Sequence, residues 1–282
     1  MQYFNHHTHT IYCDGNSEPE EYVKRALKLN FHTLGFSGHA PVPFENKFSI
    51  KDDKLEEYAG VVNKLKKRYS QQIKVYLSLE IDFIPGITHS FEYFTERCGL
   101  DYTIGGVHLV KSGDNDKLWF IDGSDPNVYD YGLKTLFNGN IRKAVETYWL
   151  QITEMVATQK PDIIAHIDKI GMHNRDRYFS EEEKWYKDLI WKVLKIVKDT
   201  GSVIEVNTRG LYKGRSDKTF PSPLLLEQIL HLKIPVTLSS DAHKPEELDG
   251  FFGETIEMLE DIGFGELMYF REEGWKKQGI HV

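Results

Sequence analysis

Short apolar runs alternate along the chain with longer segments whose apolar residues recur at helical spacing. Leu55, Tyr58, Val62 and Leu65 follow three- and four-residue steps, which predicts an amphipathic helix. Runs rich in β-branched and aromatic residues lie between such segments and predict strands. Seven strands are expected, over residues 2–4, 33–36, 74–79, 101–107, 162–165, 203–206 and 235–238.

Local signals mark several helix ends. Residues 17–20 and 180–183 each have the Ser-x-x-Glu pattern of a capping box. Ser222 before Pro223 predicts another helix start, and Gly201 is typical of the position after a helix end. Further helices are expected near residues 90–97, 141–158 and 245–261, with a final strand near 267–270.

The strand-then-helix order determines the expected fold class. Parallel neighbours need helical crossovers that wind with one hand, so the order predicts a parallel α/β sheet. Its expected form is a TIM-like (β/α)7 barrel, with residues 1–282 as a single domain. Residues 109–137 show no clean period and are rich in Gly, Asp and aromatic residues, so we interpret them as an insertion of the kind that forms lids.

Metal-binding residue types recur at or just beyond the predicted strand ends. In His7-Thr8-His9 the two imidazoles point the same way on an extended backbone and can reach one cation. The strand ends of a barrel converge on one mouth, where such folds build active sites. The candidates at this mouth are His7, His9, Asp14, His39, Glu80, His108, His166, Asp241 and His243.

Nine candidate ligands are too many for one ion, so a cluster of two or three cations is expected. Mixtures of imidazole and carboxylate suit zinc, iron or manganese better than magnesium. Glu80 is notable because a carboxylate in an apolar strand needs a partner or a cation to offset desolvation. The other six histidines are interpreted as surface or structural residues: His6, His32, His89, His173, His231 and His281.

The composition and net charge limit the classes of protein to which this chain can belong. The 282 residues are 40% hydrophobic and 28% charged, which is typical of a globular protein. A net charge of -8 argues against a nucleic-acid binder, which needs a basic stripe. Cys13 and Cys98 are expected to be thiols in a reducing compartment. The chain shows no membrane-spanning run and no signal-peptide pattern, so a cytoplasmic protein without membrane partners is expected.

Several motifs resemble, in sequence and order, those of the polymerase and histidinol phosphatase (PHP) superfamily. They are His7-x-His9, Asp14, Gly38-His39-Ala40-Pro41, Leu79-Glu80-Ile81-Asp82, Gly106-Val107-His108, Ala165-His166-Ile167-Asp168 and Ser240-Asp241-Ala242-His243. The chain length and the insertion are similar to those of monofunctional histidinol-phosphate phosphatases. The resemblance implies a distorted seven-stranded barrel whose site holds three metal ions.

The resemblance also implies how the ions would be shared. One ion would be held by His7, His9, Glu80 and Asp241. Glu80 would also bind a second ion, together with His108 and His166, and would so bridge the two ions. The third ion would be held by Asp14, His39 and His243. Some family members have a histidine near position 15, where this chain has Asp14 and Gly15, and many have an acidic residue in place of Gly38.

Such a cluster suits hydrolysis of a phosphate monoester. Multinuclear sites turn a bridging water into hydroxide, place it in line and neutralise phosphoryl charge. Asp241 is expected to orient this hydroxide, and Arg209 is expected to bind the non-bridging oxygens because a guanidinium matches phosphate geometry. With the resemblance, the expected enzyme is a histidinol-phosphatase that converts L-histidinol phosphate to L-histidinol and phosphate in histidine biosynthesis.

Three other interpretations stay open. A PHP-type nuclease or nucleotide phosphodiesterase would share every metal ligand, although the acidic composition and the insertion favour a small monoester. An amidohydrolase would also have His-x-His after its first strand, but its site commonly bridges through a modified lysine. A non-enzymatic metal-binding subunit would often lack ligands, whereas all nine positions are filled here. The sequence does not determine the oligomeric state.

Overall fold

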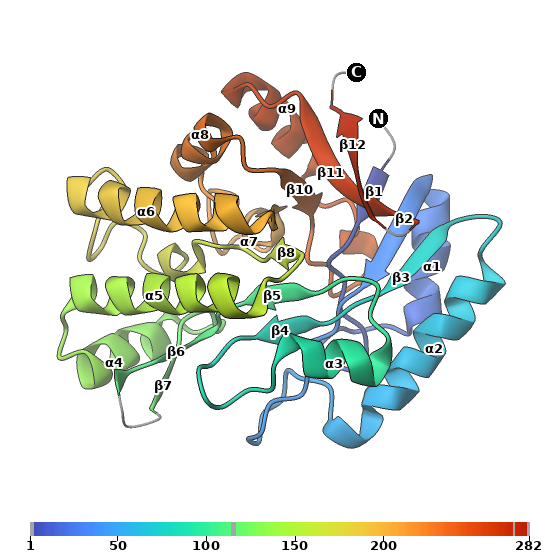
Figure 1. The fold of residues 1–282 in the computed structure, drawn as a ribbon, viewed down its shortest axis with the longest axis horizontal. Helices are drawn as coiled ribbons and strands as arrows, with labels where there is room; N and C mark the ends of the chain where they lie inside the picture. The colour runs from blue at the N-terminus through green and yellow to red at the C-terminus, as the bar shows by residue number, and fades with distance from the viewer. Residues whose placement is uncertain (1–2, 114–116, 273, 281–282) are drawn as a thin grey trace.

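Two parallel sheets and an outer layer of helices form a mixed α/β fold (Figure 1). The computed structural model describes residues 3–113, 117–272 and 274–280, so residue 2 of the first expected strand and residues 114–116 of the expected insertion lie outside it. The first sheet has the order β1 (Tyr3–Asn5), β2 (Phe31–Phe36) and β3 (Lys74–Leu77). The second has the order β10 (Val236–Ser239), β9 (Val203–Asn207), β8 (Ile163–Ile164), β5 (Ile104–Gly106) and β4 (Glu80–Asp82).

Helices cover the outside of the sheets, and α5 and α6 lie side by side (Figure 1). The helix α2 buries Leu55, Tyr58, Val62 and Leu65, the residues whose spacing predicted it. The long helices are α1 (Pro19–Lys28), α2 (Leu55–Arg68), α3 (Phe91–Cys98), α5 (Ile141–Gln159), α6 (Lys184–Thr200), α8 (Pro223–Leu232) and α9 (Phe252–Ile262). Shorter turns are α7 (Arg209–Tyr212) and the 3-10 segments Asp52–Lys54, Lys169–Gly171 and Pro245–Glu247.

The strand pairing differs from the single closed sheet that was expected. The predicted strand over residues 74–79 ends two residues early, as β3 at Leu77, and the chain then enters the other sheet as β4, which begins at Glu80. All pairings within the two sheets are parallel, as helical crossovers require. Two isolated parallel bridges, Thr8–Ala242 and His39–Glu80, connect residues of the two sheets near the strand ends.

The expected insertion has regular secondary structure, although its apolar residues recur at no regular spacing that would predict it. An antiparallel hairpin joins β6 (Leu109–Lys111) to β7 (Leu118–Phe120), and α4 (Pro126–Leu136) follows it. Trp119 packs against Tyr129 with ring centroids 4.6 Å apart and donates its indole N–H to the Tyr129 carbonyl at 2.9 Å. Gly132 permits this approach, because a Cβ there would lie 2.1 Å from Trp119. The hairpin and α4 therefore pack as one unit.

A second hairpin near the end of the chain was only half expected. The predicted final strand is β11 (Glu266–Arg271), and it pairs antiparallel with β12 (Gly274–Gly279), which was not predicted. Phe270 packs against Tyr76 and Tyr102 between the sheets. The Phe270 N–H also donates to His6 Nε2 at 2.9 Å. His6 is fully buried, so it is a structural histidine, as interpreted from the sequence.

Two helix starts differ from the predicted capping boxes. The residue before α1 is Glu18 rather than Ser17, and the Glu18 side chain makes no capping bond; Pro19 occupies the first helical position. In the second box the Ser180 N–H donates to Glu183 Oε1 at 2.9 Å, as predicted, but α6 begins only after Glu183. The turn that the box closes therefore precedes the helix.

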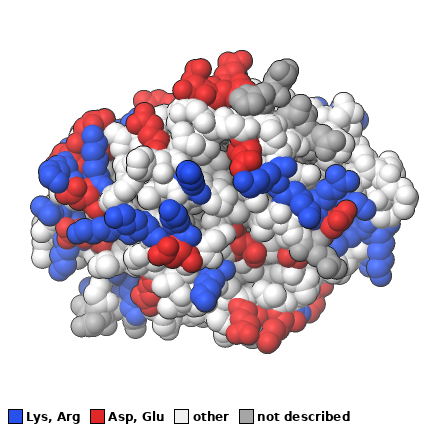
Figure 2. Space-filling model, turned by 45° about the horizontal axis from the view of Figure 1, so that its top comes forward, with Lys and Arg blue, Asp and Glu red and all other residues white. Residues whose placement is uncertain are grey.

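The surface carries charges of both signs, and Figure 2 shows them on one face. Some of these side chains pair with each other, for example Lys184 with Asp188 at 2.7 Å on α6. Cys13 and Cys98 are free thiols, as expected. Among the residues that the structure describes, no helix is both long and apolar enough to cross a bilayer.

Candidate metal centre

The first two candidate ligands lie side by side directly after β1. Thr8 pairs with Ala242, and the His9 N–H donates to the Ala242 carbonyl at 2.8 Å, so the backbone stays extended beyond the strand. The rings of His7 and His9 are 5.0 Å apart between centroids, and both side chains are buried. The two imidazoles therefore share a face, as their two-residue spacing predicted.

Glu80, at the start of β4, lies at the centre of the candidate ligands. Its side chain is 1% exposed and has imidazoles near both carboxylate oxygens. Oε2 lies 3.1 Å from His7 Nε2, 3.4 Å from His9 Nε2 and 3.1 Å from His39 Nδ1. Oε1 lies 2.9 Å from His166 Nε2 and 3.4 Å from His108 Nε2. A carboxylate in this position can bridge two cations.

The nine candidate residues converge on one volume, and we call these nine the metal centre. Three sets of ligand atoms lie within 4.8 Å of one another: His9 with Asp14, His39 and His243; His7 with His9 and Asp241; and His39 with Glu80 and His108. His166 joins them through Glu80 and through His108, whose Nε2 is 3.1 Å from its own. Because His9 and His39 each belong to two sets, the metal centre is continuous.

Five buried side-chain atoms of the metal centre have no hydrogen-bond partner. They are His7 Nε2, His9 Nε2, His39 Nδ1, His166 Nδ1 and Asp241 Oδ1. Buried polar atoms are normally paired, because an unpaired one loses its hydration without compensation. Transition-metal cations bind imidazole nitrogen and carboxylate oxygen directly. The unpaired atoms therefore fit a group of metal ions.

The charges of the metal centre depend on one another. Burial raises the pKa of Glu80, but the facing imidazoles, His7 first, outweigh it and hold the pKa well below its ordinary value. Burial alone would lower the pKa of His108. Nearby carboxylates, above all Asp82 and Asp122, outweigh this effect and raise the pKa to about 10. The buried carboxylates thus stabilise positive charge, which bound cations would supply in place of protons.

Two buried carboxylates contact candidate ligands from outside the metal centre. Glu205, on β9, has Oε1 2.6 Å from His7 Nδ1, and its Oε2 accepts the His166 N–H at 3.1 Å. Asp82 Oδ1 lies 2.7 Å from His108 Nδ1. Such contacts fix the orientation of a ligating imidazole. The sequence analysis missed Glu205, although the signal used for Glu80, a carboxylate in an apolar strand, applies to it too.

The backbone at two candidate ligands is held in an uncommon conformation. The φ angle is +27° at His166 and +52° at Asp241, in the left-handed region that residues with a Cβ rarely adopt. Such conformations cost roughly 1–3 kcal/mol and persist where the surrounding structure enforces them, often at functional sites.

Arg209 lies just after β9, at the position that the sequence predicted. Its Nη1 donates to the Asp241 carbonyl at 2.7 Å and contacts His243 Nδ1. Burial alone would lower the pKa of Arg209, but the nearby carboxylates, Asp241 first, raise it above its ordinary value. Arg209 therefore stays positively charged, and its contacts with Asp241 and His243 fix its guanidinium group beside the metal centre.

A cavity of about 330 Å³ opens over the metal centre, which is within the usual size of small-molecule sites. Lys47, Phe48, Phe120, Asp122 and Arg215 are among the residues of its wall. The insertion contributes two of these, Phe120 and Asp122, which agrees with a position over the site. The sequence analysis missed Asp122, because it follows no predicted parallel strand.

Asp122 forms an ion pair with another residue of the cavity wall that the sequence analysis missed. Its Oδ2 lies 3.3 Å from Lys169 Nζ and 3.8 Å from His108 Nε2. Burial raises the pKa of Asp122, but Lys169 and the nearby histidines lower it to about 2. The cavity wall therefore holds a carboxylate and an ammonium group beside each other.

The described histidines outside the metal centre have the positions expected of surface or structural residues. His32, His89 and His231 are exposed. His173 is buried, and its Nε2 lies 2.7 Å from the Gly123 carbonyl. His281 lies outside the described residues.

The chain belongs to the PHP domain family, whose model matches residues 5–209. This stretch contains the candidate ligands from His7 to His166 and ends at Arg209. Asp241 and His243 follow it in the chain. The resemblance seen in the motifs is confirmed.

Named relatives span most of the chain. The "Probable histidinol-phosphatase" of Deinococcus radiodurans is 27% identical over 271 residues, which cover 94% of this chain and 95% of the relative. The "Histidinol-phosphatase" of Bacillus subtilis is 26% identical over 259 residues, which cover 86% of this chain and 94% of the relative.

A solved structure has the same fold. It is histidinol phosphate phosphatase from Lactococcus lactis subsp. lactis, complexed with zinc, L-histidinol and phosphate. It aligns with a TM-score of 0.70 at 19% sequence identity, over 97% of this chain and 98% of that one. At this identity the likeness shows the fold alone.

Proposed function

We propose that this chain is a metal-dependent phosphatase that hydrolyses L-histidinol phosphate to L-histidinol and phosphate. The observation that carries the proposal is the buried metal centre at the floor of a cavity whose wall also holds Lys47, Lys169, Arg209 and Arg215. A phosphoryl group needs such a concentration of positive charge as it transfers. The relatives named histidinol-phosphatase support the choice of substrate.

The proposed cofactors are two to three divalent transition metal ions, of zinc, iron or manganese. The mixed imidazole and carboxylate donors and the unpaired buried atoms support this set. We assign one ion to the set with His7 and Asp241, one to the set with His108 and Glu80, and one to the set with Asp14 and His243. His9 and His39 each lie between two of these sets.

The side chains of this site have separate roles in the proposed reaction. Bound divalent ions would neutralise phosphoryl charge and lower the pKa of a water molecule. Arg209 binds the non-bridging phosphoryl oxygens, and Asp241 orients the attacking water. Glu205 and Asp82 hold the imidazoles of His7 and His108 in place through their other ring nitrogens.

The wall of the cavity suits the organic part of this substrate. Asp122 offers a carboxylate to the ammonium group, and Phe48 and Phe120 offer aromatic rings to the imidazole. A cavity of about 330 Å³ accommodates a small monoester. We therefore propose a small-molecule partner and no nucleic-acid partner.

Metal removal tests the metal dependence. Protein treated with a chelator should lose its activity on L-histidinol phosphate and regain it when zinc or manganese is added back. Elemental analysis of the untreated protein should find more than one transition-metal ion per chain. Full activity in metal-free protein would defeat this part of the proposal.

A comparison of substrates tests the assignment to histidinol phosphate. The metal-loaded protein should have a higher kcat/KM for L-histidinol phosphate than for p-nitrophenyl phosphate or a short oligonucleotide. Preference for the oligonucleotide would instead assign the chain to the nucleotide-directed alternative.

We also infer that the parallel strands form a distorted (β/α)7 barrel in one domain over residues 1–282, in which the consecutive short strands β3 and β4 take the place of one barrel strand. The bridges Thr8–Ala242 and His39–Glu80 between the two sheets support this inference. Limited proteolysis of a single domain should leave no stable fragment that folds alone, because domain boundaries fall in exposed linkers. A folded fragment that contains only one of the two sheets would contradict the inference.

A further inference from the structure

Tyr212, the last residue of α7, contacts the chain segment that carries Asp241. Its hydroxyl donates to the Ser240 carbonyl at 2.8 Å and also lies 3.2 Å from the Asp241 carbonyl oxygen. Gly250 leaves room for the ring, because a Cβ at Gly250 would lie 2.8 Å from Tyr212 Cδ1. One hydroxyl group therefore contacts two consecutive carbonyl groups just after β10.

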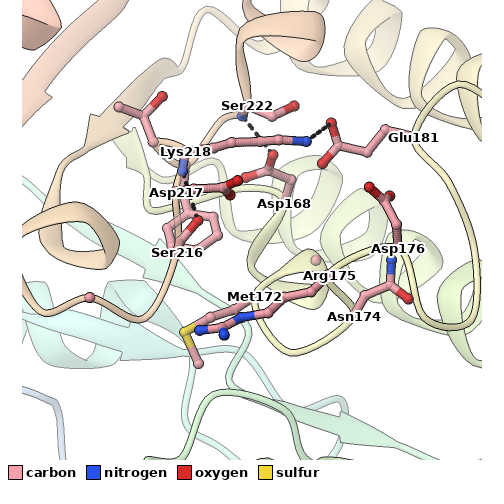
Figure 3. A pocket seen from close by; sticks show the side chains of 14 residues that line it. Asp168, Met172, Asn174, Arg175, Asp176, Glu181, Ser216, Asp217, Lys218 and Ser222 are labelled. Atoms are coloured by element: carbon pink, nitrogen blue, oxygen red, sulfur yellow. Dashed lines mark hydrogen bonds and ion pairs between the residues drawn. The ribbon is translucent and has the colours of Figure 1, made fainter.

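Tyr212 lies outside both cavities near α7. After this helix, Ser216, Asp217 and Lys218 line a second cavity, of about 360 Å³ (Figure 3). Tyr212 lines neither this second cavity nor the cavity over the metal centre. Any effect of Tyr212 on the metal centre must therefore act through the residues that its hydroxyl contacts.

The double contact depends on the backbone conformation of Asp241. In an extended strand consecutive carbonyl groups point to opposite sides, so a single hydroxyl does not reach both. Asp241 has a φ angle of +52°, in the left-handed region. In this conformation the carbonyl oxygens of Ser240 and Asp241 both lie within 3.2 Å of the Tyr212 hydroxyl. The hydroxyl therefore favours the left-handed conformation over the extended one.

The conformation of Asp241 sets the direction of its carboxylate. Oδ1 lies 3.2 Å from His9 Nε2 and 3.8 Å from His7 Nε2, within the metal centre. Oδ2 accepts from the Asn207 amide group at 3.3 Å. A rotation of the backbone at Asp241 would move Oδ1 away from the two imidazoles. A contact that fixes the backbone of Asp241 therefore also fixes this ligand atom.

Arg209 makes a different contact with the same segment. Its Nη1 donates to the Asp241 carbonyl at 2.7 Å, so it holds one carbonyl of the pair. A contact with one carbonyl tolerates a range of backbone angles, whereas a contact with two consecutive carbonyls restricts the angles between them. Tyr212 therefore determines the backbone conformation of Asp241 more narrowly than Arg209 does.

We propose that Tyr212 is a positioning residue of the metal centre, whose hydroxyl holds Asp241 in the conformation that directs Oδ1 towards the ion assigned to His7 and Asp241. This role rests on the proposed function, because it concerns one of the proposed metal ions. Its test measures metal binding, so the result does not depend on which phosphate ester is the substrate.

Tyr212→Phe is the main test, because it removes the hydroxyl and keeps the ring. Metal-free protein is titrated with zinc chloride in competition with a chromogenic chelator. We expect the variant to fold, as judged by circular dichroism, and to bind at least one zinc ion per chain about 10- to 100-fold more weakly than the wild type. This is the usual effect of losing an outer contact of a metal ligand.

Tyr129→Phe is the matched control. The Tyr129 hydroxyl likewise donates to a backbone carbonyl, that of Ile170, at 3.2 Å. Ile170 is not a candidate ligand. Each variant loses one hydrogen bond, so both metal-free proteins should unfold at a lower urea concentration than the wild type. Only Tyr212→Phe should lose zinc affinity, whereas a hydroxyl with a purely structural role would change stability alone.

Gly250→Ala is a second test that keeps the hydroxyl. The added Cβ would displace the Tyr212 ring, and the hydroxyl with it, from the two carbonyls. We expect a loss of zinc affinity in the same direction as in Tyr212→Phe. If Tyr212→Phe does not fold, this variant decides the question.

Two results would overturn the role of Tyr212 and leave the metal centre in place. One is wild-type zinc affinity in folded Tyr212→Phe, or in Gly250→Ala if Tyr212→Phe does not fold. The other is an equal loss of zinc affinity in Tyr212→Phe and Tyr129→Phe. A wild-type protein that binds no zinc, iron or manganese would instead overturn the proposed cofactors, and the role of Tyr212 with them.

Discussion

Glu80→Gln is the most direct test of the metal centre. The substitution keeps the size of the side chain and removes its charge. The Glu80 oxygens lie within 3.4 Å of imidazoles on both sides, and the side chain is buried, so water does not replace the lost charge. The amide also places an NH₂ group where cations need an acceptor.

The size of the effect follows from this burial. Removing one partner from a buried charged pair costs about 3–5 kcal/mol, which is roughly 10²- to 10⁴-fold in affinity or rate. Asp82→Asn is the matched change two residues further along β4, where the carboxylate contacts His108 on its outer nitrogen at 2.7 Å. Such outer contacts are worth roughly 10- to 100-fold. Glu80→Gln should therefore lose more activity than Asp82→Asn, by about tenfold or more.

The assay combines elemental analysis with kcat/KM for L-histidinol phosphate. Glu80→Gln should retain fewer metal ions per chain than the wild type and lose most of its activity. Glu266→Gln, at an exposed position on β11, is the control and should match the wild type. Equal losses at Glu80 and Asp82, or full metal content in Glu80→Gln, would refute the bridging role of Glu80.

Arg209→Ala should keep its metal ions but lower kcat/KM roughly 10- to 100-fold, because a charge-assisted hydrogen bond is worth about 1.5–3 kcal/mol. Loss of metal in this variant would mean that Arg209 supports the metal centre instead of the substrate. Asp122→Asn should impair turnover of L-histidinol phosphate more than that of p-nitrophenyl phosphate, which has no ammonium group. Equal impairment would exclude Asp122 from substrate recognition. Burial lowers the pKa of His6 from 6.5 to about 3, so as the pH falls below 6.5 the unfolded chain binds this proton first and the free energy of unfolding decreases. Between pH 7 and pH 5 the wild type should lose about 2 kcal/mol more than His6→Gln in urea unfolding, at about 1.4 kcal/mol per pH unit below 6.5. The same loss in both proteins would contradict this role of His6.

Local patterns in the sequence determined most of the helices and the positions of the candidate ligands. The spacing of Leu55, Tyr58, Val62 and Leu65 predicted α2, because helix geometry repeats over a few residues. The two-residue step from His7 to His9 placed both imidazoles on one face for the same local reason. The candidates on other strands could be placed together because parallel strands end at a common edge.

Only the tertiary structure decided which distant residues meet at the metal centre and its cavity. Glu205 contacts His7 from 198 residues away in the chain, and Asp122 reaches the cavity wall through the packing of β7 against α4. The change of sheet between Leu77, where β3 ends, and Glu80, where β4 begins, likewise depends on pairing with other strands. These features depend on strand pairing and side-chain packing between segments far apart in the chain, which periodicity and short motifs do not encode.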